Sequence, residues 1–136
     1  RVILTERRND SVALCSFDEP REVRSSYVEK KMPVGKPLFC IGVKDVNIPS
    51  EPKERYKKTE AINLLLHMIL SEAGDFYLEM LESGILSPGF DSGYSASPKT
   101  AYVMISGESD DPELLLEKIK EHIRLCREKG LDKADF

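Results

Sequence analysis

The chain has 136 residues, of which 40% are hydrophobic and 32% are charged, and its formal net charge is −4. This size and composition are typical of one globular domain with a single buried core. The negative charge disfavours nucleic acid and anionic membrane surfaces as partners, because both require a basic footprint. No apolar run approaches the roughly 18 residues that a membrane span needs, so no membrane partner is expected.

The N-terminus and the cysteines bear on the origin of the chain. It starts at Arg1, with no initiator Met and no secretory signal pattern, which predicts a segment trimmed from a larger protein. Cys15, Cys40 and Cys126 are odd in number and widely spaced, so they do not form a disulfide framework. They fit a reducing compartment, and a cytoplasmic location is expected. Cys40 and Cys126 lie in apolar patterns and are interpreted as core residues.

The first structured segment is predicted to be a hairpin. Residues 1–26 carry charged breaks and Pro20, and they are interpreted as an irregular connector. Residues 27–34 alternate partly in polarity and lead into a turn signal rich in Pro and Gly. Residues 38–46 are apolar on both sides, which favours a strand that is covered on both faces. The hairpin is therefore predicted over residues 28–46.

Two helical segments follow, near residues 55–83. The period becomes helical from about residue 54, and one stripe is expected to be buried: Ala61, Leu64, Leu65, Met68 and Ile69. Gly74 interrupts this pattern. A shorter stripe then consists of Phe76, Tyr77, Met80 and Leu81. Gly84 is placed directly after the C-terminus of the second helix.

A second hairpin is predicted over residues 89–107, with its turn at residues 97–100. Period-2 alternation divides its residues between two faces, and one face carries Phe90, Tyr94, Ala96, Val103 and Ile105. A third helix is predicted near residues 111–129, because Asp110 or Asp111 can cap it and Pro112 suits its first turn. Its buried stripe is expected to be Leu115, Ile119, Ile123 and Cys126, and Gly130 is expected to end it. Residues 131–136 look like the start of another helix.

The predicted order is strand, strand, helix, helix, strand, strand, helix, which gives an α+β fold. We expect a mainly antiparallel sheet of about four strands. The helices should lie on one face of this sheet, the face that carries Phe39, Ile41, Val103 and Ile105.

The opposite face of the sheet is the candidate contact surface. It carries Asp91, Gly93, Ser95, Tyr102 and Met104, and Leu38, Cys40 and Gly42 extend it. Small residues leave the backbone accessible, and an aromatic side chain with a Met gives adaptable apolar contact. A solvated face would more often carry Lys, Glu and Thr. This face is therefore predicted to be covered in the parent protein, either by its other segments or by a peptide.

No catalytic or metal-binding residue and no cofactor is expected in the chain itself. A zinc peptidase needs two His one helical turn apart and a Glu that activates water. His67 and His122 are far apart in the sequence, and both are interpreted as structural residues. Cys126 lies one helical turn after His122, a spacing that suits thiol chemistry, but its place on a buried stripe disfavours a reactive thiolate.

Several stretches, in their order, resemble the pitrilysin/insulinase family of zinc metallopeptidases. They are residues 64–70, 75–86, 90–94 and 105–113, the last containing Gly107-Glu108-Ser109-Asp110-Asp111-Pro112-Glu113, with further similarity at residues 19–23, 32–37 and 129–136. The resemblance runs from about Pro20 to Phe136. It aligns with the second, zinc-free domain of the bacterial members, although relatives are often richer in Gly and Ser than residues 71–74 are.

The resemblance implies that residues 27–136 are part of a non-catalytic domain that forms a wall of the substrate chamber. The parent protein would be a zinc-dependent hydrolase or an inactive homologue, with zinc held in a catalytic domain outside this chain. The implied partners are the remainder of the parent chain and a peptide substrate. The alternative is a free-standing α+β interaction or dimerisation module with no link to proteolysis.

Overall fold

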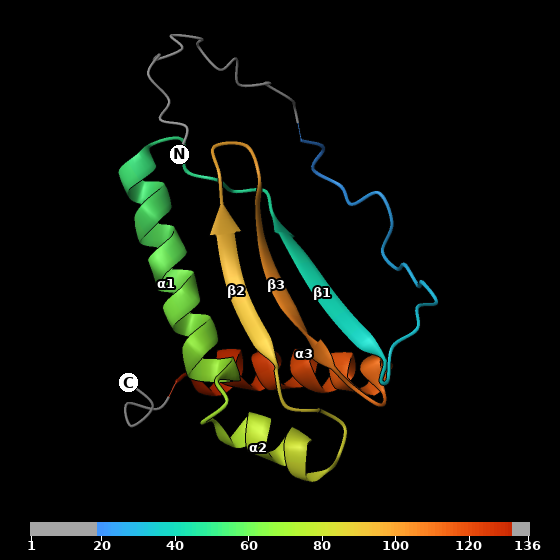
Figure 1. Cartoon of the computed structure of the whole chain (residues 1–136). Coiled ribbons are helices and arrows are strands. Elements are labelled where there is room, and N and C mark those ends of the chain that lie inside the picture. Colours follow the sequence, from blue (N-terminus) through green and yellow to red (C-terminus); the bar gives the residue numbers. More distant parts are fainter. Residues whose placement is uncertain (1–18, 132–136) are drawn as a thin grey trace, which may run out of the picture.

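The computed structural model describes residues 19–131 and confirms the α+β class (Figure 1). The elements are β1 (Leu38–Asp45), α1 (Pro52–Leu70), α2 (Asp75–Glu82), β2 (Asp91–Ala96), β3 (Ala101–Glu108) and α3 (Pro112–Lys129). In the described residues the sheet has three strands in the order β1-β3-β2, and both outer strands are antiparallel to β3. The mainly antiparallel sheet is therefore confirmed, with β3 as its middle strand.

The first half of the predicted 28–46 hairpin is wrong. Residues 19–37 contain neither helix nor strand, and Tyr27 and Val28 are 66% and 81% exposed. The partial alternation gives this segment no continuous apolar face that could be buried against the core. β1 is consequently an edge strand rather than a central one, and Cys40 on it is exposed instead of being a core residue. Residues 1–18 of the predicted connector and residues 132–136 of the expected last helix lie outside the described residues.

The core lies between the inner face of the sheet and the helices, as predicted for the face with Phe39 and Ile105. In Figure 1, α3 runs across the strands, α1 lies beside β2, and α2 lies beyond one end of the sheet. The buried side chains are Phe39, Leu66, Leu70, Phe76, Tyr77, Met80, Leu86, Phe90, Tyr94, Ala101, Ile105, Leu115 and Ile119. Gly107 allows close packing here, because a Cβ at this position would lie 3.2 Å from Phe39 Cε1.

The buried stripe of α1 differs from the predicted one. The helix buries Leu66 and Leu70 and packs Ile62 and Ile69 against the core, whereas Leu64 and Leu65 are exposed. The run of apolar residues around Leu64 makes the helix apolar on more than one side, so periodicity alone does not fix which side faces inward. The buried positions follow the predicted ones by one residue, so that Leu66 is buried in place of Leu65. The stripe of α2 is as predicted, with Phe76, Tyr77 and Met80 buried.

The helix ends follow the predicted signals. The Asp111 side chain accepts a hydrogen bond from the Leu114 amide at 3.0 Å and caps α3, which starts at Pro112. Gly84 and Gly130 have φ values of 74° and 79°, the left-handed region that glycine adopts without a steric penalty.

The second half of α3 is less buried than predicted. Leu115 and Ile119 are buried, but Ile123 is exposed and Cys126 is half-buried. The last turns of α3 no longer cross the sheet. They meet the junction between α1 and α2, which covers the side of the helix that carries His122 and Cys126.

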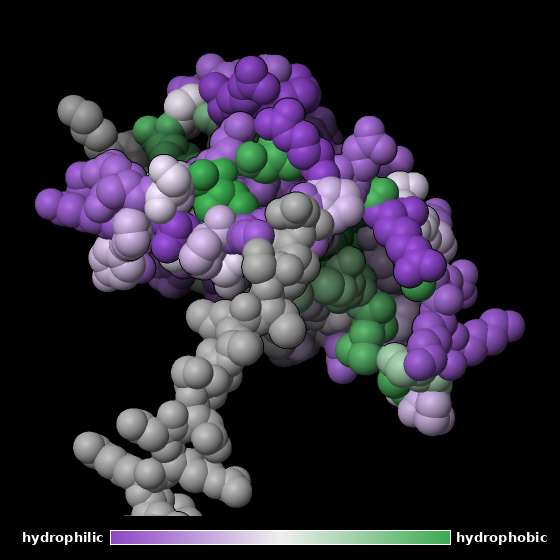
Figure 2. All heavy atoms as spheres, turned by 90° about the horizontal axis from the view of Figure 1, so that it is seen from above, coloured by the Kyte–Doolittle hydropathy of each residue, from purple (hydrophilic) through white to green (hydrophobic). Residues whose placement is uncertain are grey.

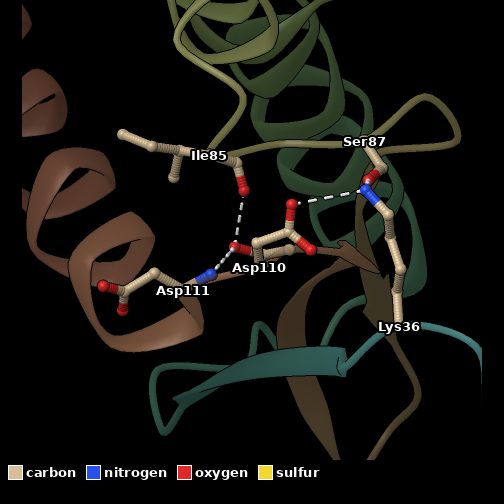
Figure 3. Close-up of polar contacts among 6 residues, drawn as sticks. Lys36, Ile85, Ser87, Asp110 and Asp111 are labelled. Atoms are coloured by element: carbon tan, nitrogen blue, oxygen red, sulfur yellow. Dashed lines mark hydrogen bonds and ion pairs between the residues drawn. The ribbon is translucent and has the colours of Figure 1, made fainter.

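A group of polar contacts that includes Lys36, Ile85 and Asp111 joins three segments where β3 leads into α3 (Figure 3). Ser109 supplies the hydroxyl between Ile85 and Asp111. Its side chain is fully buried, and its hydroxyl donates to the Ile85 carbonyl at 2.7 Å and accepts from the Asp111 amide at 3.1 Å. Its own amide donates to the Pro37 carbonyl at 3.1 Å. Beside it, the Lys36 ammonium donates to the Ser87 hydroxyl at 3.1 Å and pairs with Asp110 at 3.3 Å. The segments before β1, before β2 and after β3 are thus held together by one buried hydroxyl and one lysine.

A second polar group ties the other end of the sheet to α1. The Tyr94 hydroxyl on β2 donates to Asp45 Oδ2 on β1 at 2.7 Å, reaching across the middle strand. Lys58 of α1 pairs with the same carboxylate at 2.5 Å and also donates to the Asn47 carbonyl at 2.8 Å. Ala101, which lies between the two strands on β3 and is buried, is small enough to leave room for the tyrosine ring.

This group shifts two pKa values. Burial raises the pKa of Asp45, but the hydrogen bonds from Lys58, from the Asn47 amide and from Tyr94 outweigh burial and hold the pKa below 3.8. Burial, and then the hydrogen bond to the Asp45 carboxylate and its charge, raise the pKa of Tyr94 to about 12. At neutral pH the pair is therefore a neutral phenol that donates to an ionised carboxylate.

We expect Tyr94→Phe to lower the free energy of unfolding by about 1–2 kcal/mol at pH 7, because Asp45 loses a charged hydrogen bond. The tyrosine contribution is fully present below pH 10 and is lost as the pH rises through about 12. The Asp45 contribution is present above pH 3.8 and is lost as the pH falls through the lower folded-state pKa. The stability difference between wild type and variant, measured by urea unfolding across pH, should therefore be largest between about pH 4 and pH 10. Tyr102→Phe, whose side chain is exposed, serves as the control. Equal pH profiles of Tyr94→Phe and wild type would contradict the prediction.

We expect Ser109→Ala to destabilise the fold by about 2 kcal/mol, because the Ile85 carbonyl and the Asp111 amide both lose their buried partner. Ser95→Ala, at an exposed position of the sheet, should change stability by less than about 0.5 kcal/mol. Thermal unfolding followed by circular dichroism measures both changes. A Ser109→Ala variant as stable as Ser95→Ala would show that the junction does not depend on this hydroxyl.

Candidate functional site

The strand register brings the five predicted contact residues together on the outward face of the sheet. Met104 on β3 lies opposite Gly93 on β2 and Gly42 on β1, and in the next row Tyr102 lies opposite Ser95 and Lys44. Asp91 and Cys40 flank Ser106 in the row on the other side. We call the surface formed by these rows the outward face, which consists of Leu38, Cys40, Gly42, Lys44, Asp91, Gly93, Ser95, Tyr102, Met104, Ser106 and Glu108.

The outward face combines open backbone at two glycines with two large exposed side chains. A Cβ built on Gly42 or Gly93 would meet no atom within 4 Å, so the backbone is open on both sides of Met104. Met104 and Tyr102 are 44% and 41% exposed, although similar side chains on the inner face are buried. Seen from above, the molecule exposes separate apolar areas among polar side chains (Figure 2). The outward face also mixes polar and apolar groups, with a flexible Met and an aromatic ring beside two glycines.

Charges lie only at the rim of the outward face. Lys44 pairs with Glu19 at 2.6 Å and also donates to the Pro20 carbonyl, so the segment before β1 is attached at this corner. Asp91 and Glu108 lie at the opposite end of the rows. The middle of the face thus carries no charged side chain, which lowers the desolvation cost of covering it.

Sequence reasoning missed a groove between α1 and the free edge of β2. The side-chain amide of Asn63 on α1 forms the two backbone hydrogen bonds that a neighbouring strand would otherwise form with Tyr94. Its Oδ1 accepts from the Tyr94 amide at 2.7 Å, and its Nδ2 donates to the Tyr94 carbonyl at 3.3 Å. Next to this contact lies a groove with a volume of about 800 Å³. The available signal was the polar residue Asn63 inside the apolar run of α1.

The geometry of His122 disfavours thiol chemistry. The His122 ring stacks on Phe76 with centroids 4.3 Å apart, and its Nε2 lies 2.8 Å from the Ile69 carbonyl oxygen. A carbonyl accepts only, so this nitrogen carries the proton and donates. The same Nε2 lies 3.6 Å from Cys126 Sγ, and a protonated nitrogen cannot remove the thiol proton. His122 therefore joins α3 to the end of α1, as expected for a structural residue.

The residues between 19 and 131 contain no group of three or more His, Cys, Asp or Glu that could hold a metal ion. His67 is exposed beside the groove on α1, and His122 is committed to the Ile69 carbonyl. These side chains do not fit a zinc site, and no catalytic step is assigned to them. Over the same residues, no helix combines the length and the apolar character that crossing a membrane requires.

Comparison with known proteins gives one informative match. No family model and no curated protein matches the chain. A solved structure from Alicyclobacillus acidocaldarius, described as an M16-like peptidase, has a TM-score of 0.70 and 27% sequence identity to it. The match covers 76% of this chain and 24% of that protein, so the chain spans about a quarter of its length. This chain therefore has the fold of one part of an M16-like peptidase, in agreement with the resemblance to pitrilysin/insulinase-like peptidases.

Proposed function

We propose that this chain is a non-catalytic structural domain of a zinc-dependent, M16-like peptidase and forms part of the wall of its substrate chamber. The observation that carries the proposal is the extent of the structural match, which takes in 76% of this chain and only 24% of the peptidase. A segment that folds like a quarter of a peptidase would act together with the remainder of such a protein. Zinc would be held in that remainder.

The outward face supports this role. Its middle is uncharged and partly apolar, and it exposes Tyr102 and Met104, which would be more stable out of water. In the proposed arrangement the face is covered by other segments of the parent protein or by a peptide in the chamber. Its small residues would let either kind of cover approach the strands closely.

A second candidate function is a dimerisation module, and the free edge of β1 favours it. In the antiparallel pairing the backbone groups of Gly42 and Lys44 point away from β3, and the described residues form no strand beside them. An open edge of this kind can pair with a second copy. Light scattering on the complete protein distinguishes the two candidates. A dimerisation module forms a dimer through this edge, whereas the chamber-wall role requires none.

Cys40 is a native reporter on the outward face. In the complete protein we expect alkylation of Cys40 by a maleimide, followed by peptide mass spectrometry, to be at least about ten-fold slower than that of a reference thiol, because cover of 1.4 kcal/mol or more reduces access by that factor. A Glu117→Cys variant, at an exposed position of α3, supplies the reference thiol. Equal rates at both positions would show that the outward face is uncovered and would exclude the chamber-wall role.

The same cover predicts an energetic effect in the complete protein. Tyr102→Ala and Met104→Ala should each either lower its stability by about 2 kcal/mol, if its own segments cover the face, or raise KM for peptide, if substrate does. Glu117→Ala is the control on a solvated helix face. Wild-type stability together with wild-type peptide turnover in both variants would mark the outward face as ordinary surface.

A further inference from the structure

The side of α1 that faces away from the core carries an apolar stripe. It consists of Ala61, Leu64, Leu65 and Met68, which recur at the spacing of one helix face. Leu64 and Leu65 are 51% and 42% exposed, and Ala61 is exposed as well. Figure 1 shows α1 at one side of the molecule, with β2 next to it and no described element on its far side. We call these four residues the outer stripe of α1.

The outer stripe is more apolar than a solvated helix face. The opposite side of α1 packs Ile62, Leu66 and Leu70 against or into the core, so the second half of the helix is apolar nearly all round. Helices of that kind are normally covered on every side. Two leucines left in water forgo the hydrophobic stabilisation that their burial would supply. The outer stripe therefore indicates a contact surface.

The outer stripe is complementary to itself when two copies of α1 lie antiparallel. A two-fold axis between Leu64 and Leu65 places Leu64 of one copy opposite Leu65 of the other. The same axis places the small Ala61 side chain opposite the large Met68 side chain. Every such contact occurs twice, and a small residue opposite a large one lets the two helices interdigitate closely.

The ends of the outer stripe carry opposite charges in the same register. Lys57 lies one helical turn before Ala61, and Glu72 follows Met68 just beyond the end of α1. Glu72 and Leu64 line the same groove, so this carboxylate lies on the side of the stripe. The antiparallel arrangement places Lys57 of each copy opposite Glu72 of the other, whereas a parallel arrangement would bring like charges together.

The ion pair that Lys57 forms within its own chain does not prevent this contact. Its partner is Glu54, one turn earlier, at 2.7 Å, and both side chains are more than half exposed. Exposed pairs of this kind contribute little to stability. The lysine can therefore pair across the interface at little cost.

We propose that the outer stripe of α1 pairs with the same stripe of a second copy of this chain, as an antiparallel two-helix contact. Self-complementarity favours a second copy, because an unrelated partner requires no relation between Ala61 and Met68 or between Lys57 and Glu72. One helix pair buries less than the roughly 1,200 Å² of stable interfaces. The dimer is therefore weak, and its Kd is expected in the micromolar range.

This contact is distinct from the outward face and from the free edge of β1. The strand order is β1-β3-β2 and α1 packs beside β2, so β1 is the strand farthest from α1 (Figure 1). A dimer through α1 leaves both other surfaces free. The inference consequently does not rest on the chamber-wall role, and either proposal can fail without the other.

Sedimentation velocity of the complete protein over a range of concentrations measures the dimer. Leu65→Glu places a carboxylate against Leu64 of the second copy, and the change occurs twice in the contact. It should raise the Kd at least about 100-fold, because each carboxylate would be desolvated without a partner. A dimer through the β1 edge would keep its Kd in this variant.

Charge reversal tests the register. Lys57→Glu alone and Glu72→Lys alone each bring like charges together at both ends of the contact, and each should raise the Kd about ten-fold. An equimolar mixture of the two variants restores opposite charges in the mixed dimer, and one chain that carries both changes restores them in its own dimer. Both should return the Kd to within about two-fold of wild type. Lys120→Glu, at an exposed position of α3, changes the net charge as Lys57→Glu does and should leave the Kd unchanged.

The proposal is overturned if Leu65→Glu dimerises like wild type, or if the mixture and the doubly changed chain dimerise no better than the single variants. It is also overturned if the complete protein stays monomeric at the highest concentration that sedimentation allows. A Leu65→Cys variant that then resists alkylation would assign the outer stripe to another segment of the parent chain. Circular dichroism checks that each variant is folded.

Discussion

The arrangement of this molecule depends on the pairing of both outer strands with β3. Because the side chains of a strand alternate between two faces, this double pairing fixes in one step which residues of β1 and β2 meet the helices and which meet the outside. Phe39 and Ile105 then enter the core, and Gly42, Met104 and Gly93 form a row on the other side. Two polar groups hold the ends of this arrangement, the buried Ser109 hydroxyl at one end and the Asp45–Tyr94–Lys58 group at the other. Each of them connects elements that backbone pairing alone leaves independent.

Much of the fold could be predicted from the sequence, because several of its signals are local. The cap formed by Asp111 and Pro112, the left-handed glycines Gly84 and Gly130 and the turn at residues 97–100 depend on a few neighbouring side chains. Alternation also assigned the outward face correctly, since a period of two is unambiguous once a strand is recognised. Sequence patterns did not predict the features that depend on tertiary contacts. The run Leu64-Leu65-Leu66 allows several buried stripes on α1, and the contact between Asn63 and Tyr94 selects one of them. Residues 27–34 have strand-like alternation without a partner that would bury them.

The outward face and the groove also differ in how far they could be predicted from the sequence. The outward face could be listed from the sequence, because its residues lie on two predicted strands. The groove could not, because it exists only where α1 meets the edge of β2, and no local pattern gives the distance between a helix and a strand that are distant in the chain. Asn63 was the one visible sign. A polar residue in an apolar helical run needs a partner if it faces inward, and here that partner is the Tyr94 backbone.

The two edges of the sheet are protected unequally against pairing with further strands. At the β2 edge, the Asn63 amide blocks the growth of further strands past Tyr94. At the β1 edge, the described residues supply only the charge of Lys44 against such growth, and that lysine is neutralised in part by Glu19. Aggregation through strand pairing would therefore start from β1, and the aggregates would consist of sheets joined at that one edge.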